Sequence, residues 1–179
     1  SLEAVAAEVR RLLEPELPGS LLESVRMLPR LREMGHAVPR MVGSGRCQEV
    51  VESEGKLLDS LPIMQCWPED AGRFITLPVV ITKHPVTGTR NVGMYRMQVF
   101  DGAATGMHWH VHKGGAQHYR VAEAMGQRLE VAVALGPDPA VTYAATAPLP
   151  EDVDEFMFAG FLRKRPVELV KCKTVDLEV

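Results

Sequence analysis

The spacing of apolar positions changes along the chain, from a helical pattern at the start to strand-like runs in the remainder. Apolar residues recur at helical spacing over Leu2–Leu13, which predicts an amphipathic helix ended by Pro15. A second helix is predicted over 21–28, with Ser20 as its N-cap. Glycines and a proline between 35 and 45 predict a connection without regular structure.

Short apolar and β-branched runs in the rest of the chain predict strands joined by tight turns. The runs that predict strands are 47–52, 61–64, 74–81, 93–100, 105–112, 129–135 and 167–173. The run 129–135 is almost continuously apolar, so we expect a central strand there. Turns are predicted at 84–89, 101–102 and 136–139. Helices are predicted over 116–125, ended by Gly126, and over 153–162.

Strands joined as hairpins, with two or three inserted helices, predict an α+β fold built on a mainly antiparallel barrel. We expect residues 1–46 to form a helical N-terminal extension and residues 47–179 to form the barrel domain. The chain opens at Ser1 and closes at Val179 directly after a strand-like run. We therefore expect both ends to continue in a longer protein.

Composition and charge narrow the range of partners and compartments. Hydrophobic residues make up 46% of the chain and charged residues 24%, which is ordinary for a globular protein. The net charge of -3 provides no basic field, so we expect no nucleic-acid partner. No apolar run approaches the ~18 residues of a membrane span. The three cysteines are far apart and outside any CxxC spacing, which favours a reducing compartment, the cytoplasm.

Polar side chains are unusually dense in the predicted hairpin 91–115. They are Asn91, Arg96, Gln98, His108, His110, His112 and Lys113. On a regular strand the three histidines share one face, opposite Trp109 and Val111. Three aligned imidazoles with a nearby carboxylate could bind a first-row divalent metal ion. A solvent-facing polar strand would show the same alternation, so both interpretations stay open.

Two features of this hairpin suggest an anion. Arg96 lies mid-strand between Met94 and Gln98, where a buried guanidinium needs an anionic partner, either a ligand or a neighbouring glutamate. Lys113 and the glycines at 114–115 precede a predicted helix, whose N-terminal amides and dipole suit a phosphate group. The same glycines would equally serve a tight turn.

Glu155 has two interpretations. Asp152 and Glu155 have the spacing of a capping arrangement at a helix N-terminus. Alternatively, the Glu155 carboxylate projects from the first helical turn into a site as a metal ligand. The hypothesis for the whole hairpin is that Asn91, Arg96 and Glu155 converge on a common cavity. Asn91 and Arg96 are five residues apart, so this requires that the strand begin after Asn91 or bulge at Gly93.

Several motifs, in order, carry a family resemblance. NVGMYRMQVFD, GMHWHVHKGG, DEFMFAGFLR and ELVKCKTVDLEV closely resemble segments of the UbiD-like decarboxylases, which use prenylated FMN. CQEVV, LPIMQCWPEDAGRFITLP and TGTRN upstream are also similar to that family. The resemblance covers 47–179, with a looser fit before it. It implies a split-barrel flavin-binding domain from the middle of a longer homo-oligomeric enzyme, whose C-terminal oligomerisation domain is absent here.

The resemblance also implies roles for individual residues. In that family Mn2+ holds the cofactor phosphate, with K+ close by, and Asn91, His112 and Glu155 correspond to the metal ligands. The positions that correspond to cofactor-contacting residues are Met94, Tyr95, Arg96, His108, Trp109, His110, Lys113 and Gly114. Arg96 also corresponds to the arginine that binds the substrate carboxylate and works with two catalytic glutamates. Those glutamates come after Val179, so we expect this chain to be inactive alone.

The activity implied for the full-length protein is non-oxidative decarboxylation of an aromatic or α,β-unsaturated carboxylic acid. The cofactor would accept electron density as CO2 leaves, while Arg96 positions the carboxylate and a glutamate delivers a proton. Two alternatives remain: a non-catalytic flavin- or metal-binding module, and a cupin-like metal-binding barrel built on HWHVH. The cupin-like alternative needs a carboxylate soon after the histidines, and 114–117 offers none.

Overall fold

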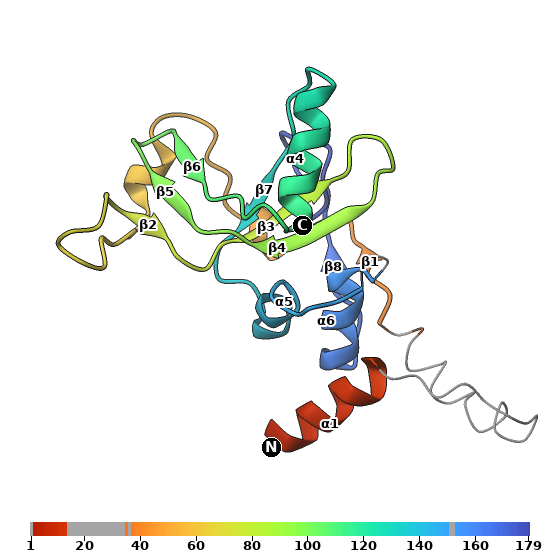
Figure 1. Cartoon of the computed structure of the whole chain (residues 1–179). Helices are drawn as coiled ribbons and strands as arrows, with labels where there is room; N and C mark the ends of the chain where they lie inside the picture. Colours follow the sequence, from red (N-terminus) through yellow and green to blue (C-terminus); the bar gives the residue numbers. More distant parts are fainter. Residues whose placement is uncertain (1, 14–34, 36, 151–152) are drawn as a thin grey trace, which may run out of the picture.

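Short strands and helices alternate along the chain in the computed structural model, which describes residues 2–13, 35, 37–150 and 153–179 (Figure 1). The helices are α1 (Leu2–Leu13), α4 (Gly114–Ala124), α5 (Pro139–Ala144) and α6 (Glu155–Arg163), with 3-10 turns η1 (Arg46–Gln48) and η2 (Leu57–Ser60). The strands are β1 (Arg40–Met41), β2 (Phe74–Ile75), β3 (Val79–Lys83), β4 (Arg90–Met94), β5 (Met97–Val99), β6 (Thr105–Met107), β7 (Ala132–Ala134) and β8 (Glu168–Leu169).

The strands form small separate sheets. One antiparallel sheet has the order β4-β3-β7, and a second has the order β2-β5-β6. β1 and β8 form a two-stranded parallel pair. Over the described ranges these sheets do not join into a closed barrel. The structure is therefore a mixed α/β arrangement with small antiparallel sheets.

The β4-β3-β7 sheet is covered on both faces. Side chains of a strand alternate between faces, and Val79, Ile81 and Val92 pack into the main apolar core together with residues of α5 and α6. On the opposite face the Thr82 hydroxyl lies 2.9 Å from Nδ1 of His118, which belongs to α4. Figure 1 shows α4 on one side of the β3–β4 ribbon and α5 and α6 on the other. Asn91 pairs with Thr82 and so belongs to the α4 face.

Local sequence signals fix the two C-terminal helices. Asp154 is the N-cap of α6, and its carboxylate accepts hydrogen bonds from the amides of Phe156 (2.7 Å) and Met157 (3.3 Å). α6 ends at Arg163, and its C-cap residue Lys164 adopts the left-handed conformation (φ 55°). α5 begins directly after its N-cap residue Asp138, and a proline lies in its first turn. The predicted Asp152 cap lies outside the described residues.

Several helical and turn predictions are confirmed. α1 has the predicted bounds, and its Val9 packs against the core. The turn at 84–89 closes through a hydrogen bond from the His84 amide to the Thr89 carbonyl (2.8 Å). α4 ends before Gly126, which has φ 66°. The helix predicted over 21–28 lies outside the described part of the chain. Within that part, no helix has the length and apolarity needed to cross a bilayer.

The strand predictions are wrong in extent, and some of the predicted runs contain no strand. Residues 47–52 contain the end of η1 and no strand. The run 93–100 is split between β4 and β5, which belong to different sheets, and Tyr95 and Arg96 between them belong to neither strand. The run 129–135 contains only β7, which pairs with β3 alone and lies at the sheet edge. The central strand is β3, whose first four residues are buried.

The strand predicted over 105–112 is also wrong beyond Met107. β6 stops there, and residues 111–113 form a turn that leads into α4. Val111 is therefore 64% exposed and does not pack opposite the histidines. Residues 61–64 form no strand, and 74–81 is interrupted between β2 and β3. Of the run 167–173, only β8 is a strand.

Candidate functional site

Glu155 lies at the open edge of β4. Its carboxylate oxygen Oε2 accepts a hydrogen bond of 3.1 Å from the backbone amide of Val92, which makes no β3–β4 bond and points out of the sheet. Burial raises the pKa of Glu155 to about 7, and the hydrogen bonds from the amides of Glu155 and Val92 offset this only in part. A partly desolvated carboxylate of this kind is well suited to bind a cation.

Asn91 lies beside the N-terminus of α4. Its side-chain oxygen Oδ1 packs so tightly against Gly114 that a Cβ on residue 114 would overlap it. Its amide nitrogen lies 3.4 Å from the Tyr95 hydroxyl. The glycine therefore makes room for the Asn91 amide between β4 and α4. The Glu155 carboxylate bonds the amide of Val92, which follows Asn91 in the strand.

Tyr95 fills a slot between two glycines. A Cβ on Gly93 would lie 2.5 Å from the tyrosine ring, and one on Gly115 would lie 3.0 Å from it. The Tyr95 hydroxyl accepts a hydrogen bond of 2.9 Å from the Gly115 amide, one of the free donors at the start of α4. The ring also meets Trp109 edge-on, with centroids 5.0 Å apart. Tyr95 therefore anchors the α4 N-terminus to β4.

The first turn of α4 has donors left for an anion. Among the described residues no acceptor is found for the amides of Gly114 and Ala116. Lys113, the N-cap residue, is exposed and has extended backbone geometry (φ -93°, ψ 150°). This combination of free amides, a helix dipole and a cation is typical of phosphate sites.

An ion-pair network that the sequence did not reveal supports the same strand. Arg90 Nε donates to Asp154 at 3.1 Å, and the guanidinium lies 5.0 Å from the centroid of the Phe156 ring. Arg90 Nη1 also lies 3.6 Å from Glu178, which pairs with Lys83 at 2.9 Å. This network fixes the start of α6, and with it Glu155, against β4. The TGTRN motif contains Arg90, but nothing in the sequence identifies its partner 64 residues away.

Arg96 lies apart from this group. It follows the break between β4 and β5, its side chain is exposed, and its guanidinium lies 5.0 Å from the centroid of the Phe74 ring. The described contacts do not bring it to Asn91 or Glu155. Met94 pairs with Val79 and so belongs to the α5–α6 face, whereas Tyr95 folds back to the α4 face. Because β4 ends at Met94, Asn91 and Arg96 do not belong to one regular strand, and they need not point to opposite faces of it.

The three histidines are exposed and occupy the loop and turn that lead to α4. The His108 amide donates to the Arg96 carbonyl at 3.1 Å, and the rings of His110 and His112 have centroids 5.7 Å apart. Trp109 is half-buried and stacks on Tyr119 (6.2 Å, 21° between planes). Within the described ranges no group of three or more His, Cys, Asp or Glu side chains is arranged to hold a metal ion.

The donor set fits a hard divalent cation in part. The amide oxygen of Asn91 and the carboxylate of Glu155 are oxygen donors of the kind that Mn2+ and Mg2+ accept. The Glu155 carboxylate bonds the amide of Val92, the residue that follows Asn91 in β4. The Glu155 carboxylate is partly buried; desolvation raises its pKa, and the positive charge of Arg90 offsets this only in part. His112 is exposed in the turn that precedes α4.

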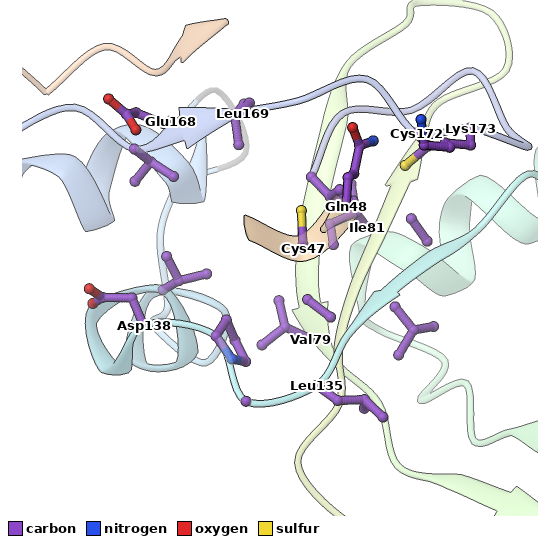
Figure 2. A pocket seen from close by; sticks show the side chains of 18 of the residues that line it. Cys47, Gln48, Val79, Ile81, Leu135, Asp138, Glu168, Leu169, Cys172 and Lys173 are labelled. Carbon is purple, nitrogen blue, oxygen red and sulfur yellow. The ribbon is translucent and has the colours of Figure 1, made fainter. Parts of the chain in front are cut away.

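A large cavity lies elsewhere in the described part of the chain. It has a volume of about 800 Å³ and runs between the β3–β7 edge, η1 and the segment after β8 (Figure 2). Its walls include Val79, Ile81 and Leu169, and none of the predicted site residues lines it. The polar groups around Asn91 are better evidence for a functional site than the volume of this cavity. Ligand recognition depends on a few polar groups in defined positions.

The chain belongs to the UbiD family. The family described as the 3-octaprenyl-4-hydroxybenzoate carboxy-lyase Rift-related domain matches residues 40–179. An uncharacterised protein of Archaeoglobus fulgidus is 55% identical over 163 residues, which cover 90% of this chain and 33% of that protein. An uncharacterised protein of Aquifex aeolicus is 48% identical over 178 residues, covering 99% and 37%. The chain therefore spans about one third of the length of these relatives.

Solved structures of UbiD-class enzymes have the same fold. The enzyme HmfF from Pelotomaculum thermopropionicum, in complex with FMN, is 36% identical with a TM-score of 0.74, over 83% of this chain and 35% of that one. Vanillic acid decarboxylase from Sedimentibacter hydroxybenzoicus, in closed form, is 28% identical with a TM-score of 0.76, over 89% and 36%. The resemblance to the UbiD-like decarboxylases is thereby confirmed at the level of family and fold.

Proposed function

We propose that this chain is the cofactor-binding part of a non-oxidative decarboxylase that acts on aromatic or α,β-unsaturated carboxylic acids through prenylated FMN. The observation that carries the proposal is the arrangement of Asn91, Glu155 and Gly114 around the edge of β4 and the start of α4. The match to a carboxy-lyase family and the likeness to an FMN complex support it.

The residues have separate tasks in this proposal. Asn91 and Glu155, with His112 as a third ligand, hold Mn2+, and the free amides of α4 together with Lys113 bind the cofactor phosphate. Met94, Tyr95, His108, Trp109 and His110 line the flavin. When bound, the prenylated flavin withdraws electron density from the substrate as CO2 leaves. Arg96 binds the substrate carboxylate and holds it in position, a task for which a planar guanidinium is suited.

The remaining parts of the proposal concern the whole protein. Residues 47–179 contribute to a split flavin-binding barrel, residues 1–46 belong to its N-terminal region, and the full-length enzyme is a cytoplasmic homo-oligomer. K+ accompanies Mn2+ near the phosphate. The partner is a small carboxylic acid.

A reconstitution experiment tests the binding part. The chain is mixed with prenylated FMN and Mn2+, desalted, and examined for bound flavin by absorbance, with EDTA-treated protein alongside. We expect flavin to remain bound only with the metal ion, and Glu155→Gln to weaken metal-dependent retention at least roughly tenfold. The exposed Glu168→Gln is the matched control. Equal retention with and without metal, in all three proteins, would contradict the proposed site.

A second candidate is a flavin- or metal-binding module without catalysis. The exposed position of Arg96, over Phe74 and away from Asn91 and Glu155, favours it. The two functions separate in the full-length protein loaded with cofactor. Release of CO2 from an aromatic or α,β-unsaturated acid supports the decarboxylase, whereas bound flavin without CO2 release supports the binding module.

A further inference from the structure

We propose that Cys47 and Cys172 are a redox-active thiol pair that closes into an intramolecular disulfide when the chain meets hydrogen peroxide. The two cysteines are 125 residues apart and come from different elements, Cys47 from η1 and Cys172 from the segment after β8. Both line the cavity of about 800 Å³, and Figure 2 shows them there together. This site is separate from the one around Asn91.

Backbone contacts hold the two segments side by side. The Val42 amide donates to the Leu169 carbonyl at 2.8 Å, which continues the β1–β8 pairing. Further along, Gln48 Nε2 donates to the Lys171 carbonyl at 2.7 Å. Gln48 follows Cys47 in the chain, and Lys171 precedes Cys172. The bond between Gln48 and Lys171 therefore joins the immediate neighbours of the two cysteines. This pairing brings the two thiols to one wall of the cavity.

A glycine permits this close approach. A Cβ on Gly45 would lie 2.5 Å from Val170 Cγ1 and 3.6 Å from Cys47 Sγ. Any larger residue at position 45 would push the η1 turn away from the segment after β8. The Cys172 backbone is itself fixed, because its amide donates to the Leu177 carbonyl at 2.8 Å.

The environments of the two thiols assign their order of reaction. Cys47 is exposed, whereas Cys172 is partly buried. Burial raises the pKa of the Cys172 thiol, and the nearby carboxylate of Glu178 raises it further. Cys47 is therefore the thiol that meets peroxide first, and Cys172 is the resolving thiol.

The chemistry balances with peroxide as the oxidant. The Cys47 sulfur takes one oxygen from hydrogen peroxide to give a sulfenic acid, and the other oxygen leaves as water. The Cys172 sulfur then attacks the Cys47 sulfur and displaces the hydroxyl group as a second water molecule. Two thiols and one peroxide thus give one disulfide and two waters. The bridge would tie η1 to the C-terminal segment, which carries Glu178, the partner of Lys83.

The experiment oxidises the native chain with hydrogen peroxide, alkylates remaining thiols in denaturant, and maps peptides by mass spectrometry. We expect a Cys47–Cys172 linked peptide, an intact mass lower by about 2 Da before alkylation, alkylated Cys66, and reversal by dithiothreitol. Cys66→Ser, which removes the exposed third cysteine, should keep the cross-link. Cys47→Ser and Cys172→Ala should each abolish it.

Loop entropy provides an internal control for folding. Cys47 and Cys66 are only 19 residues apart, so the unfolded chain should favour that bridge over Cys47–Cys172 by roughly 15- to 20-fold. Oxidation in denaturant should therefore switch the product to Cys47–Cys66. A Cys47–Cys66 bridge in the native chain, bridges only between chains, or over-oxidised Cys47 beside a free Cys172 would each overturn the proposal.

Discussion

The side-chain oxygen of Asn91 lies against the α-carbon of Gly114, in a space that any side chain at position 114 would occupy. This contact joins β4 to the first turn of α4, and both elements carry groups of the candidate site. Position 114 therefore requires glycine because a side chain would not fit there. Backbone freedom is not the reason, because the φ angle of Gly114 is not in the positive range.

Gly114→Ala should displace the Asn91 amide and lower metal-dependent flavin retention at least roughly tenfold. Alanine favours a helix by ~1 kcal/mol over glycine, so the stability of the variant should fall less than its ligand binding. Absorbance of retained flavin and urea unfolding measure the two effects separately. Gly43→Ala is the control, because a Cβ there meets nothing within 4 Å. Unchanged flavin retention in Gly114→Ala would remove Asn91 from the site.

Glu155→Gln should stabilise the metal-free chain above pH 7. The pKa of Glu155 is raised from 4.5 to about 7, so the folded state holds a proton that the unfolded state loses, and stability falls as pH rises through this window. At pH 8 the cost of the charge is about 2 to 3 kcal/mol, and glutamine removes it while it still accepts from Val92. Urea unfolding at pH 5 and pH 8 tests this. Equal stability of both proteins at pH 8 would show that the carboxylate is not desolvated.

His118 should contribute the opposite pH dependence. Burial and, to a smaller extent, the nearby His84 together lower its pKa from 6.5 to about 4. The unfolded state therefore binds more protons, and stability falls by about 2 kcal/mol as pH drops from 6.5 to 4. His118→Gln should abolish this loss and leave the slope due to Glu155 visible, whereas Glu155→Gln should reveal the slope due to His118. The exposed His108→Gln is the control. If His118→Gln and wild type show the same slope, His118 does not titrate in this range.

The sequence predicted the elements whose signals are local. The helical spacing over Leu2–Leu13 and the glycine that ends α4 required only neighbouring residues, and both predictions are confirmed. The Asn91 and Glu155 pair was proposed from a resemblance and stays a prediction; Glu155 bonds the amide of Val92, the residue after Asn91. The sequence was therefore sufficient where residues close to one another in the chain determine the conformation.

The errors arise where tertiary contacts override a local pattern. The alternation over 93–100 fits one strand, but the Tyr95 ring folds back over Gly93 to bond the Gly115 amide, and this breaks the strand. The alternation of the histidines also fits a strand, yet the chain turns after Met107 to begin α4. Neither the Tyr95–Gly115 bond nor the turn after Met107 could be predicted from the spacing of residues, because each depends on a residue from another element.

Tyr95→Phe should destabilise the chain by ~1 to 2 kcal/mol, because the Gly115 amide would lose its acceptor in a buried position. Tyr95 is 3% exposed, and its ring would keep its packing as phenylalanine. The change should also raise amide hydrogen exchange in the first turn of α4. Tyr143→Phe is the matched control, since Tyr143 is 50% exposed and should change stability by less than about 0.5 kcal/mol. Equal stability of the two variants would show that the hydroxyl bond is dispensable.

Arg96→Ala should separate catalysis from folding in the full-length enzyme. The described contact of its side chain is with the Phe74 ring, at 5.0 Å, and an exposed interaction of this type contributes ~0.5 to 1 kcal/mol. Stability and flavin retention should therefore stay close to wild type, while release of CO2 from the substrate acid is lost, because the carboxylate would lose its guanidinium partner. Arg128→Ala, also at an exposed position, is the control and should keep full activity. Substrate turnover and bound-flavin absorbance, measured on the same samples, decide the matter: turnover retained in Arg96→Ala would remove Arg96 from catalysis, and flavin lost with it would give the residue a cofactor-binding task instead.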